Sequence, residues 1–131
     1  LIHSKKEKVY NAIATQEGVR NWWTVQTNIR SEVGGKAEFR FGEKYLIIME
    51  ITELVPQLKV GWKCREGDEQ WVGTEFSFDL EEEDGDTTLR FGHVNWRSQT
   101  EFFAHCNFQW GKYLMSLKDF CESGKGEPFN P

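Results

Sequence analysis

Hydrophobic and polar residues alternate along the middle of the chain, and this period of two predicts β-strands. Turn signals separate the alternating segments: a Gly34–Gly35 pair, Pro56, and the Asp84–Gly85 pair that is typical of a tight hairpin. Since the turns are short, neighbouring strands are expected to pair antiparallel, with one face of the sheet wet. The predicted strand segments cover residues 34–41, 45–55, 58–65, 73–83 and 87–94, and Pro56 ends the second of them.

The alternation also predicts which side chains face the interior. Ala37, Phe39 and Phe41 share one face in the first of these segments. The same reasoning puts the following sets inward in the third, fourth and fifth segments: Leu58, Val60, Trp62 and Cys64; Thr74, Phe76, Phe78 and Leu80; Leu89, Phe91 and His93.

Helical periodicity replaces the alternation at both ends of the chain. Residues 1–3 are typical of the end of a strand, and the spacing from Ser4 to Glu7 matches a capping box that would start a helix. A second short helix is expected near residues 15–24, followed by the strands. A long helix is predicted from about residue 99 to Ser123, with Gly124 as its C-cap and residues 125–131 as a tail. Its apolar stripe consists of Phe103, Cys106, Trp110, Leu114, Leu117 and Cys121.

Together these elements predict an α+β fold in a single domain spanning residues 1–131. A curved antiparallel sheet must cover its apolar face, and the long C-terminal helix is the element large enough to do so. Two short helices follow the first strand. Space left between the sheet and the long helix is the natural place for a ligand.

Composition narrows the possible functions. The 131 residues include 6 Trp, 10 Phe and 3 Tyr, so the chain has either a bulky core or a cavity lined with rings. A net charge of −5 argues against nucleic-acid binding, which needs a basic face. No apolar run is long enough to span a membrane. Three cysteines without a repeated spacing argue against a disulfide framework and favour a cytoplasmic location.

The candidate catalytic groups are weak. His105 and Cys106 are adjacent on the predicted helix and therefore point in different directions, so we interpret Cys106 as a core residue. Neither a metal-ligand motif nor a cofactor motif is present, and no metal or cofactor is expected. Residues 81–84 are interpreted as a solvated acidic tip beside a turn. His93 has two readings, a hydrogen-bonded core histidine and the polar anchor of a cavity.

A candidate ligand site follows from the inward faces of the strands and helices. Trp62 on the sheet and Trp110 on the long helix could meet across it. The predicted ligand-binding residues are Trp22, Phe39, Phe41, Met49, Trp62, Phe76, Phe78, Phe91, His93, Phe103, Trp110 and Leu114.

The order of elements and several stretches resemble the START-like (SRPBCC) superfamily, and within it the family related to activators of the heat-shock-protein-90 ATPase. The resemblance covers nearly the whole chain. It implies a helix-grip fold, in which a curved sheet grips a long C-terminal helix around a deep cavity. It also implies binding of lipids, hormones, aromatic polyketides or other apolar molecules, with some members acting as cyclases or hydrolases. The stretches that carry the resemblance are residues 8–23, 34–42, 51–64, 73–96 and 108–126.

Three hypotheses remain open at this point. The first is a module that binds a small hydrophobic or aromatic ligand without catalysis. The second is a regulator of a heat-shock-protein-90-type ATPase, acting through its outer surface. The third is a cyclase or dehydratase that uses His93 as acid or base, although no second catalytic group is evident. Whichever of these holds, the chain is expected to be a monomer or a homodimer.

Overall fold

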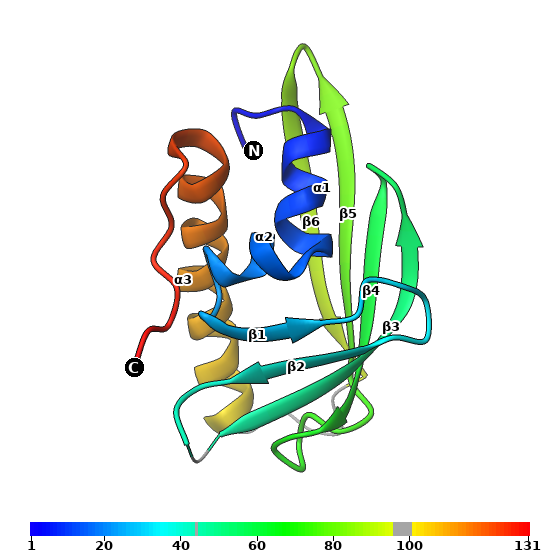
Figure 1. Cartoon of the computed structure of the whole chain (residues 1–131), viewed down its shortest axis with the longest axis vertical. Helices are drawn as coiled ribbons and strands as arrows, with labels where there is room; N and C mark the ends of the chain where they lie inside the picture. Colours follow the sequence, from blue (N-terminus) through cyan, green and yellow to red (C-terminus); the bar gives the residue numbers. More distant parts are fainter. Residues whose placement is uncertain (44, 96–100) are drawn as a thin grey trace.

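The computed structural model describes residues 1–43, 45–95 and 101–131, with the side chains of residues 101–104 and 107 left aside. The described residues form a six-stranded sheet in which each strand pairs antiparallel with its neighbour in sequence (Figure 1). The elements are α1 (Lys6–Ala14), α2 (Gln16–Arg20), β1 (Gln26–Ile29), β2 (Lys36–Arg40), β3 (Leu46–Val55), β4 (Lys59–Glu66), β5 (Glu75–Glu83), β6 (Asp86–Val94) and α3 (Glu101–Ser123).

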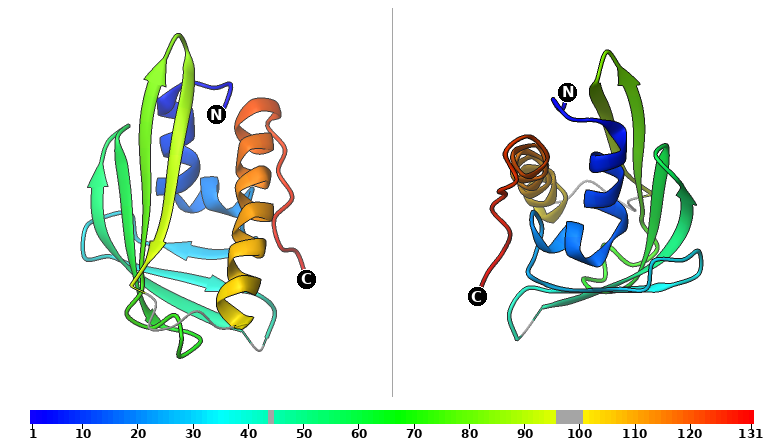
Figure 2. Two further views of the ribbon diagram at one scale, coloured as in Figure 1. Left: turned by 180° about the vertical axis from the view of Figure 1, so that it is seen from behind. Right: turned by 45° about the horizontal axis from the view of Figure 1, so that its top comes forward.

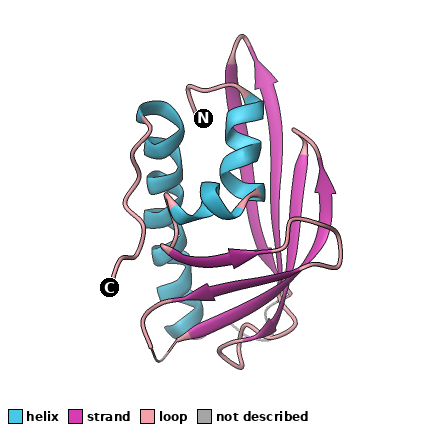
Figure 3. Ribbon diagram, viewed as in Figure 1, coloured by secondary structure: helices cyan, strands magenta, loops and turns pink. Residues whose placement is uncertain are grey.

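The sheet curls strongly and holds the helices on its concave side. In Figure 1, β1 and β2 run across the view while β5 and β6 run nearly vertically, and Figure 2 shows the same turn from behind and from above. Figure 3 shows the three helices gathered on one side of the strands. The predicted α+β helix-grip arrangement is therefore confirmed.

Strand faces agree closely with the alternation in the sequence. The inward residues of β5, which include Phe76 and Phe78, are buried, as are Val60, Trp62 and Cys64 of β4. The hairpin between β5 and β6 turns at Asp84 and Gly85, both with positive φ (54° and 83°), as a tight hairpin turn requires.

Several local predictions were wrong. Leu58 precedes β4 and is 51% exposed instead of facing inward. The short strand β1 was not anticipated. The helix α2 ends at Arg20, so Trp22 and Trp23 lie beyond it, although both are buried. The structure describes α3 from Glu101, and residues 99 and 100, where the helix was predicted to begin, lie outside the described residues, so that boundary stays a prediction.

The prediction of a capping box at the start of α1 was also wrong. Lys5 is the N-cap residue, and among the described residues no local side chain caps the helix. The backbone N–H of Lys6 instead donates to Glu82 Oε1 at 3.0 Å. A carboxylate at a helix N-terminus accepts a hydrogen bond from a free backbone N–H and also interacts favourably with the helix dipole. Glu82 of the acidic run therefore caps a helix from a distant strand.

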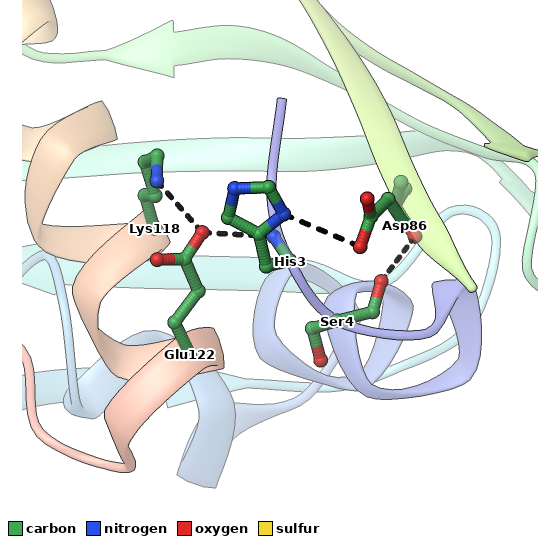
Figure 4. Close-up of polar contacts among 6 residues, drawn as sticks. His3, Ser4, Asp86, Lys118 and Glu122 are labelled. Atoms are coloured by element: carbon green, nitrogen blue, oxygen red, sulfur yellow. Dashed lines mark hydrogen bonds and ion pairs between the residues drawn. The ribbon is translucent and has the colours of Figure 1, made fainter. Parts of the chain in front are cut away.

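Polar contacts hold the N-terminal residues to α3 and β6 (Figure 4). The backbone N–H of His3 donates to Glu122 Oε2 at 2.8 Å, and the same oxygen accepts from Lys118 Nζ at 2.7 Å. His3 Nδ1 lies 3.3 Å from Asp86 Oδ1. The His3 N–H bond, followed by the Lys118 bond, lowers the pKa of Glu122. These hydrogen bonds hold the N-terminal residues against the last turns of α3.

The C-terminal tail is docked along the molecule. Phe129 pairs with Thr24 in a parallel bridge and packs against Phe41 with ring centroids 5.5 Å apart. Upstream, the backbone N–H of Glu127 donates to Ser116 Oγ at 2.7 Å. Gly124 ends α3 with a φ of 83°, as the predicted C-cap requires.

Candidate functional site

A pocket of about 260 Å³ opens between α3 and the region where β2 ends and β3 begins. Trp23 enters it from the segment after α2, and Trp71 from the loop between β4 and β5. We call this space the aromatic pocket. Its lining residues are Trp23, Phe41, Tyr45, Ile47, Trp71, His105, Cys106, Gln109, Trp110 and Tyr113.

Three indole rings form the inner walls of the aromatic pocket. Trp71 and Trp110 are stacked, with ring centroids 6.2 Å apart and planes 13° apart, and Trp23 lies 5.0 Å from Trp110. The indole N–H of Trp71 donates to Cys106 Sγ at 3.1 Å. These side chains are buried, and their ring faces give the pocket large apolar walls, while the indole Nε1 of Trp110 is buried without a hydrogen-bond partner among the described residues.

Polar groups lie toward solvent at the same pocket. His105 is exposed, and Gln109, Tyr45 and Tyr113 are partly buried. Burial, followed by the charge of Asp68, raises the pKa of Tyr45 to about 12, so its hydroxyl keeps its proton at neutral pH. The pocket can therefore offer hydrogen bonds to one polar end of a ligand.

Cys106 is not equipped as a nucleophile. Burial raises the pKa of its thiol, and the hydrogen bond from Trp71 opposes this only in part. Because the thiolate is the reactive form, a raised pKa keeps the sulfur inert at neutral pH. In the described chain all three cysteines are free and buried.

The structure describes the predicted ligand-binding residues at more than one place in the molecule. Phe41 and Trp110 line the aromatic pocket. Leu114 is partly buried against the core, and the side chain of Phe103 lies outside the described part of the structure. The remaining predicted residues lie in the core between sheet and helices: Trp22, Phe39, Met49, Trp62, Phe76, Phe78, Phe91 and His93.

Contacts between rings occupy part of the space that was expected to be a deep cavity. Trp23 lies 4.4 Å from Phe39, Phe91 lies 4.6 Å from Trp110, and Trp62 is stacked on Trp23 at 5.9 Å, all between ring centroids. The aromatic pocket is the part of that space that these rings leave open toward solvent. Whether the core residues also touch a ligand stays a prediction.

His93 sits among the rings of the core. Its Nε2 lies 2.8 Å from Thr74 Oγ1, and its ring stacks on Phe76 at 3.8 Å between centroids. Burial lowers the pKa of His93 to about 3, so the ring is neutral at physiological pH. His93 is not among the residues that line the aromatic pocket. This geometry favours a core histidine and lends no support to acid–base catalysis.

Several lining residues were missed by sequence reasoning. Trp71 lies in a loop, where alternation carries no information. His105, Gln109 and Tyr113 follow one another at intervals of four along α3, so they form a line beside its apolar stripe. That line of hydrogen-bonding side chains was the signal that could have located the rim of the pocket.

The described residues hold no group of three or more His, Cys, Asp or Glu side chains placed to bind a metal ion. No helix within the described ranges is long and apolar enough to cross a membrane.

Comparison with known proteins gives one family and a consistent fold. The family model described as Activator of Hsp90 ATPase homolog 1-like protein matches residues 3–122. The chain is similar to a solution structure of an Aha1 dimer from Colwellia psychrerythraea, with 41% identity, a TM-score of 0.85, and coverage of 95% of this chain and 93% of that chain. None of the curated proteins compared with the chain matches it.

More distant structures share the fold alone. A protein from Mesorhizobium loti is 15% identical, with a TM-score of 0.81 and coverage of 91% of this chain and 90% of that chain. CalU16 from Micromonospora echinospora is 16% identical, with a TM-score of 0.77 and coverage of 95% of this chain and 71% of that chain.

Proposed function

The chain belongs to the Activator of Hsp90 ATPase homolog 1-like family, and on that premise we propose that it binds a small aromatic molecule in the aromatic pocket. The observation that carries the proposal is the pocket itself, with walls formed by Trp23, Trp71 and Trp110 and hydrogen-bonding groups toward solvent. Concave, mostly apolar sites with a few convergent polar groups are the usual form of small-molecule sites.

The dimensions of the pocket restrict the ligand. Its volume of about 260 Å³ lies just below the roughly 300–1,000 Å³ of sites for drug-sized molecules. The ligand is therefore a one- or two-ring compound, flat enough to lie along Trp71 and Trp110. It carries one polar group, because Tyr45 and Gln109 offer hydrogen bonds at the same pocket.

Tryptophan fluorescence and thermal shift test this proposal, with indole and 1-naphthol as probes. Trp23, Trp71 and Trp110 line the pocket, so binding is expected to change the tryptophan emission as well as raise Tm. Gln109→Trp is expected to fill the pocket and abolish both effects. The matched control is Asp119→Trp, the same new side chain at an exposed position on the same helix. Absence of any response in the wild type, or an unchanged response in Gln109→Trp, would contradict the proposal.

A second candidate function is regulation of an Hsp90-type ATPase. The observation that favours it is the similarity to a protein called Aha1, which is 41% identical to this chain over nearly its whole length. Its test is the ATPase rate of the Hsp90 from the same organism, measured with increasing amounts of this chain. An unchanged rate, together with no binding in a pull-down, would count against it.

We also propose that the chain forms a homodimer. The similarity to a protein whose solution structure is a dimer supports this assembly. Sedimentation velocity over a range of protein concentrations tests it, and a sedimentation coefficient that stays at the monomer value at the highest concentration would contradict it.

A further inference from the structure

The helix α3 has a second apolar face, directed away from the aromatic pocket. Phe108 is 73% exposed and Met115 is 57% exposed. These residues are seven positions apart, which places them within about 20° of each other around a helix of 3.6 residues per turn. Trp110, on the inward stripe, is buried. The two side chains lie about 10 Å apart along the helix axis, with the exposed Lys112 between them.

Gly111 lies between Phe108 and Met115 along the helix. A Cβ atom built at this position would meet nothing within 4 Å, so the space beside its backbone is open. Glycine on a helix surface lets another backbone approach closely, although it lowers helix propensity. We define Phe108, Gly111 and Met115 as the α3 outer face.

We infer that the α3 outer face joins two copies of this chain, whose α3 helices lie antiparallel across a two-fold axis beside Gly111. The inference rests on the homodimer proposed above and names its surface. In a two-fold interface, if residue i of one subunit meets residue j of the other, then j also meets i. Phe108 then contacts Met115 of the partner subunit, and Met115 contacts Phe108 of the partner subunit.

This pairing follows from the pattern on the helix. In this antiparallel register the exposed apolar side chains of one subunit are covered by those of the other. The midpoint of the register falls between Gly111 and Lys112. At this midpoint the two helices come closest, which is where the open space at Gly111 is needed. The methionine sulfur also gains a favourable contact with the aromatic ring of the other subunit. A second copy of the chain therefore offers apolar side chains that cover Phe108 and Met115 and a helix that can approach closely at Gly111.

Sedimentation velocity with substituted chains tests the surface. Phe108→Glu and Met115→Glu are each expected to convert the dimer to monomer at concentrations where the wild type is dimeric. Both positions are exposed, so circular dichroism and Tm are expected to stay close to wild type. The matched control, Val33→Glu, puts the same charge on an exposed valine in the loop between β1 and β2, and it should remain dimeric.

A cysteine at the axis tests the register independently. Gly111→Cys is expected to form a disulfide-linked dimer under mild oxidation, since residues beside a two-fold axis meet their own copies. Val33→Cys is the control and should stay uncrosslinked. The native cysteines are buried and should not compete.

The outcomes separate the surface from the dimer proposal. A wild type that is monomeric at every concentration overturns both. A dimer that survives Phe108→Glu and Met115→Glu overturns the surface and leaves the homodimer standing. Loss of the dimer in these variants without crosslinking of Gly111→Cys overturns the antiparallel register. Loss of the dimer together with crosslinking supports the inference in full.

Discussion

Replacing Trp23 with alanine removes the ring that connects the aromatic pocket to the core of the sheet. Trp23 is 2% exposed and lines the pocket on one side. On its other sides it stacks on Trp62 at 5.9 Å and lies 4.4 Å from Phe39 and 5.0 Å from Trp110, between ring centroids. The substitution therefore removes contacts with several rings and extends the pocket inward.

The size of the effect follows from the buried area. A tryptophan buries about 150–250 Å², which at about 25 cal/mol per Å² corresponds to roughly 4–6 kcal/mol. Large-to-small substitutions of this kind cost about 3–5 kcal/mol in well-packed cores. We expect Trp23→Ala to lower the free energy of unfolding by about 4 kcal/mol. Urea denaturation followed by circular dichroism measures it.

Added indole then distinguishes this position from its neighbour. The space vacated in Trp23→Ala is continuous with the pocket, so indole can refill it. At ten times its Kd, indole should restore about 1.4 kcal/mol. Trp22 is the matched control, because it is fully buried, donates its indole N–H to Ala12 O at 2.7 Å and does not line the pocket. A loss below about 1 kcal/mol in Trp23→Ala, or equal rescue of Trp22→Ala, would refute this reasoning.

Three further predictions concern titration and tail docking. The pKa of His93, lowered by burial to about 3, lies below its unfolded value of about 6.5. The unfolded chain therefore binds more protons, and stability falls as pH drops from about 6.5 toward 3. After allowing for the partial exposure of His93, we expect the free energy of unfolding at pH 5 to be about 1 kcal/mol lower than at neutral pH. Urea titrations at several pH values measure this loss, which should be absent in His93→Phe. For Glu122, whose pKa is lowered by the His3 N–H and Lys118, the stabilisation is present at neutral pH and is lost on acidification below about pH 4.5. The difference in Tm between wild type and Glu122→Gln should therefore shrink at low pH. In Gly126→Ala, the new Cβ would clash with the backbone oxygen of Asn21, so the tail should undock at a cost of about 1–3 kcal/mol. Faster hydrogen exchange at the Phe129 amide, which is bonded to Trp23 O, would show the undocking.

The sheet was predictable because successive side chains of every strand point to opposite faces, and this produces the alternation of hydrophobic and polar residues in the sequence. Phe76 and Phe78 face inward for the same reason that Ser77 and Asp79 do not, and no knowledge of other elements is needed. Leu58 was misplaced because it lies just before β4, where the alternation no longer applies. The cap on α1 was misread because its acceptor, Glu82, comes from a strand far along the chain. Local spacing cannot reveal such a partner.

The pocket was predictable in kind but not in its residues. The abundance of aromatic residues and the covering helix indicated a ring-lined space. Phe41 and Trp110, two of the predicted residues, line the aromatic pocket, and their contact with a ligand stays a prediction. Periodicity could not tell which inward rings touch each other and which face an opening. Trp62 and Phe39 fill the interior, whereas Trp71, from a loop without periodicity, forms a wall. That division depends on how the sheet curls, which no local pattern encodes.

The most direct test of ligand binding is a titration of the ¹⁵N-labelled protein with 1-naphthol, followed through the indole N–H signals of its tryptophans. We expect saturable shifts that are largest at Trp71 and Trp110, whose rings form the pocket walls. The signal of Trp22, whose N–H is bonded to Ala12 O, should move least. A titration that leaves the signals of Trp71 and Trp110 unshifted would contradict ligand binding in the aromatic pocket.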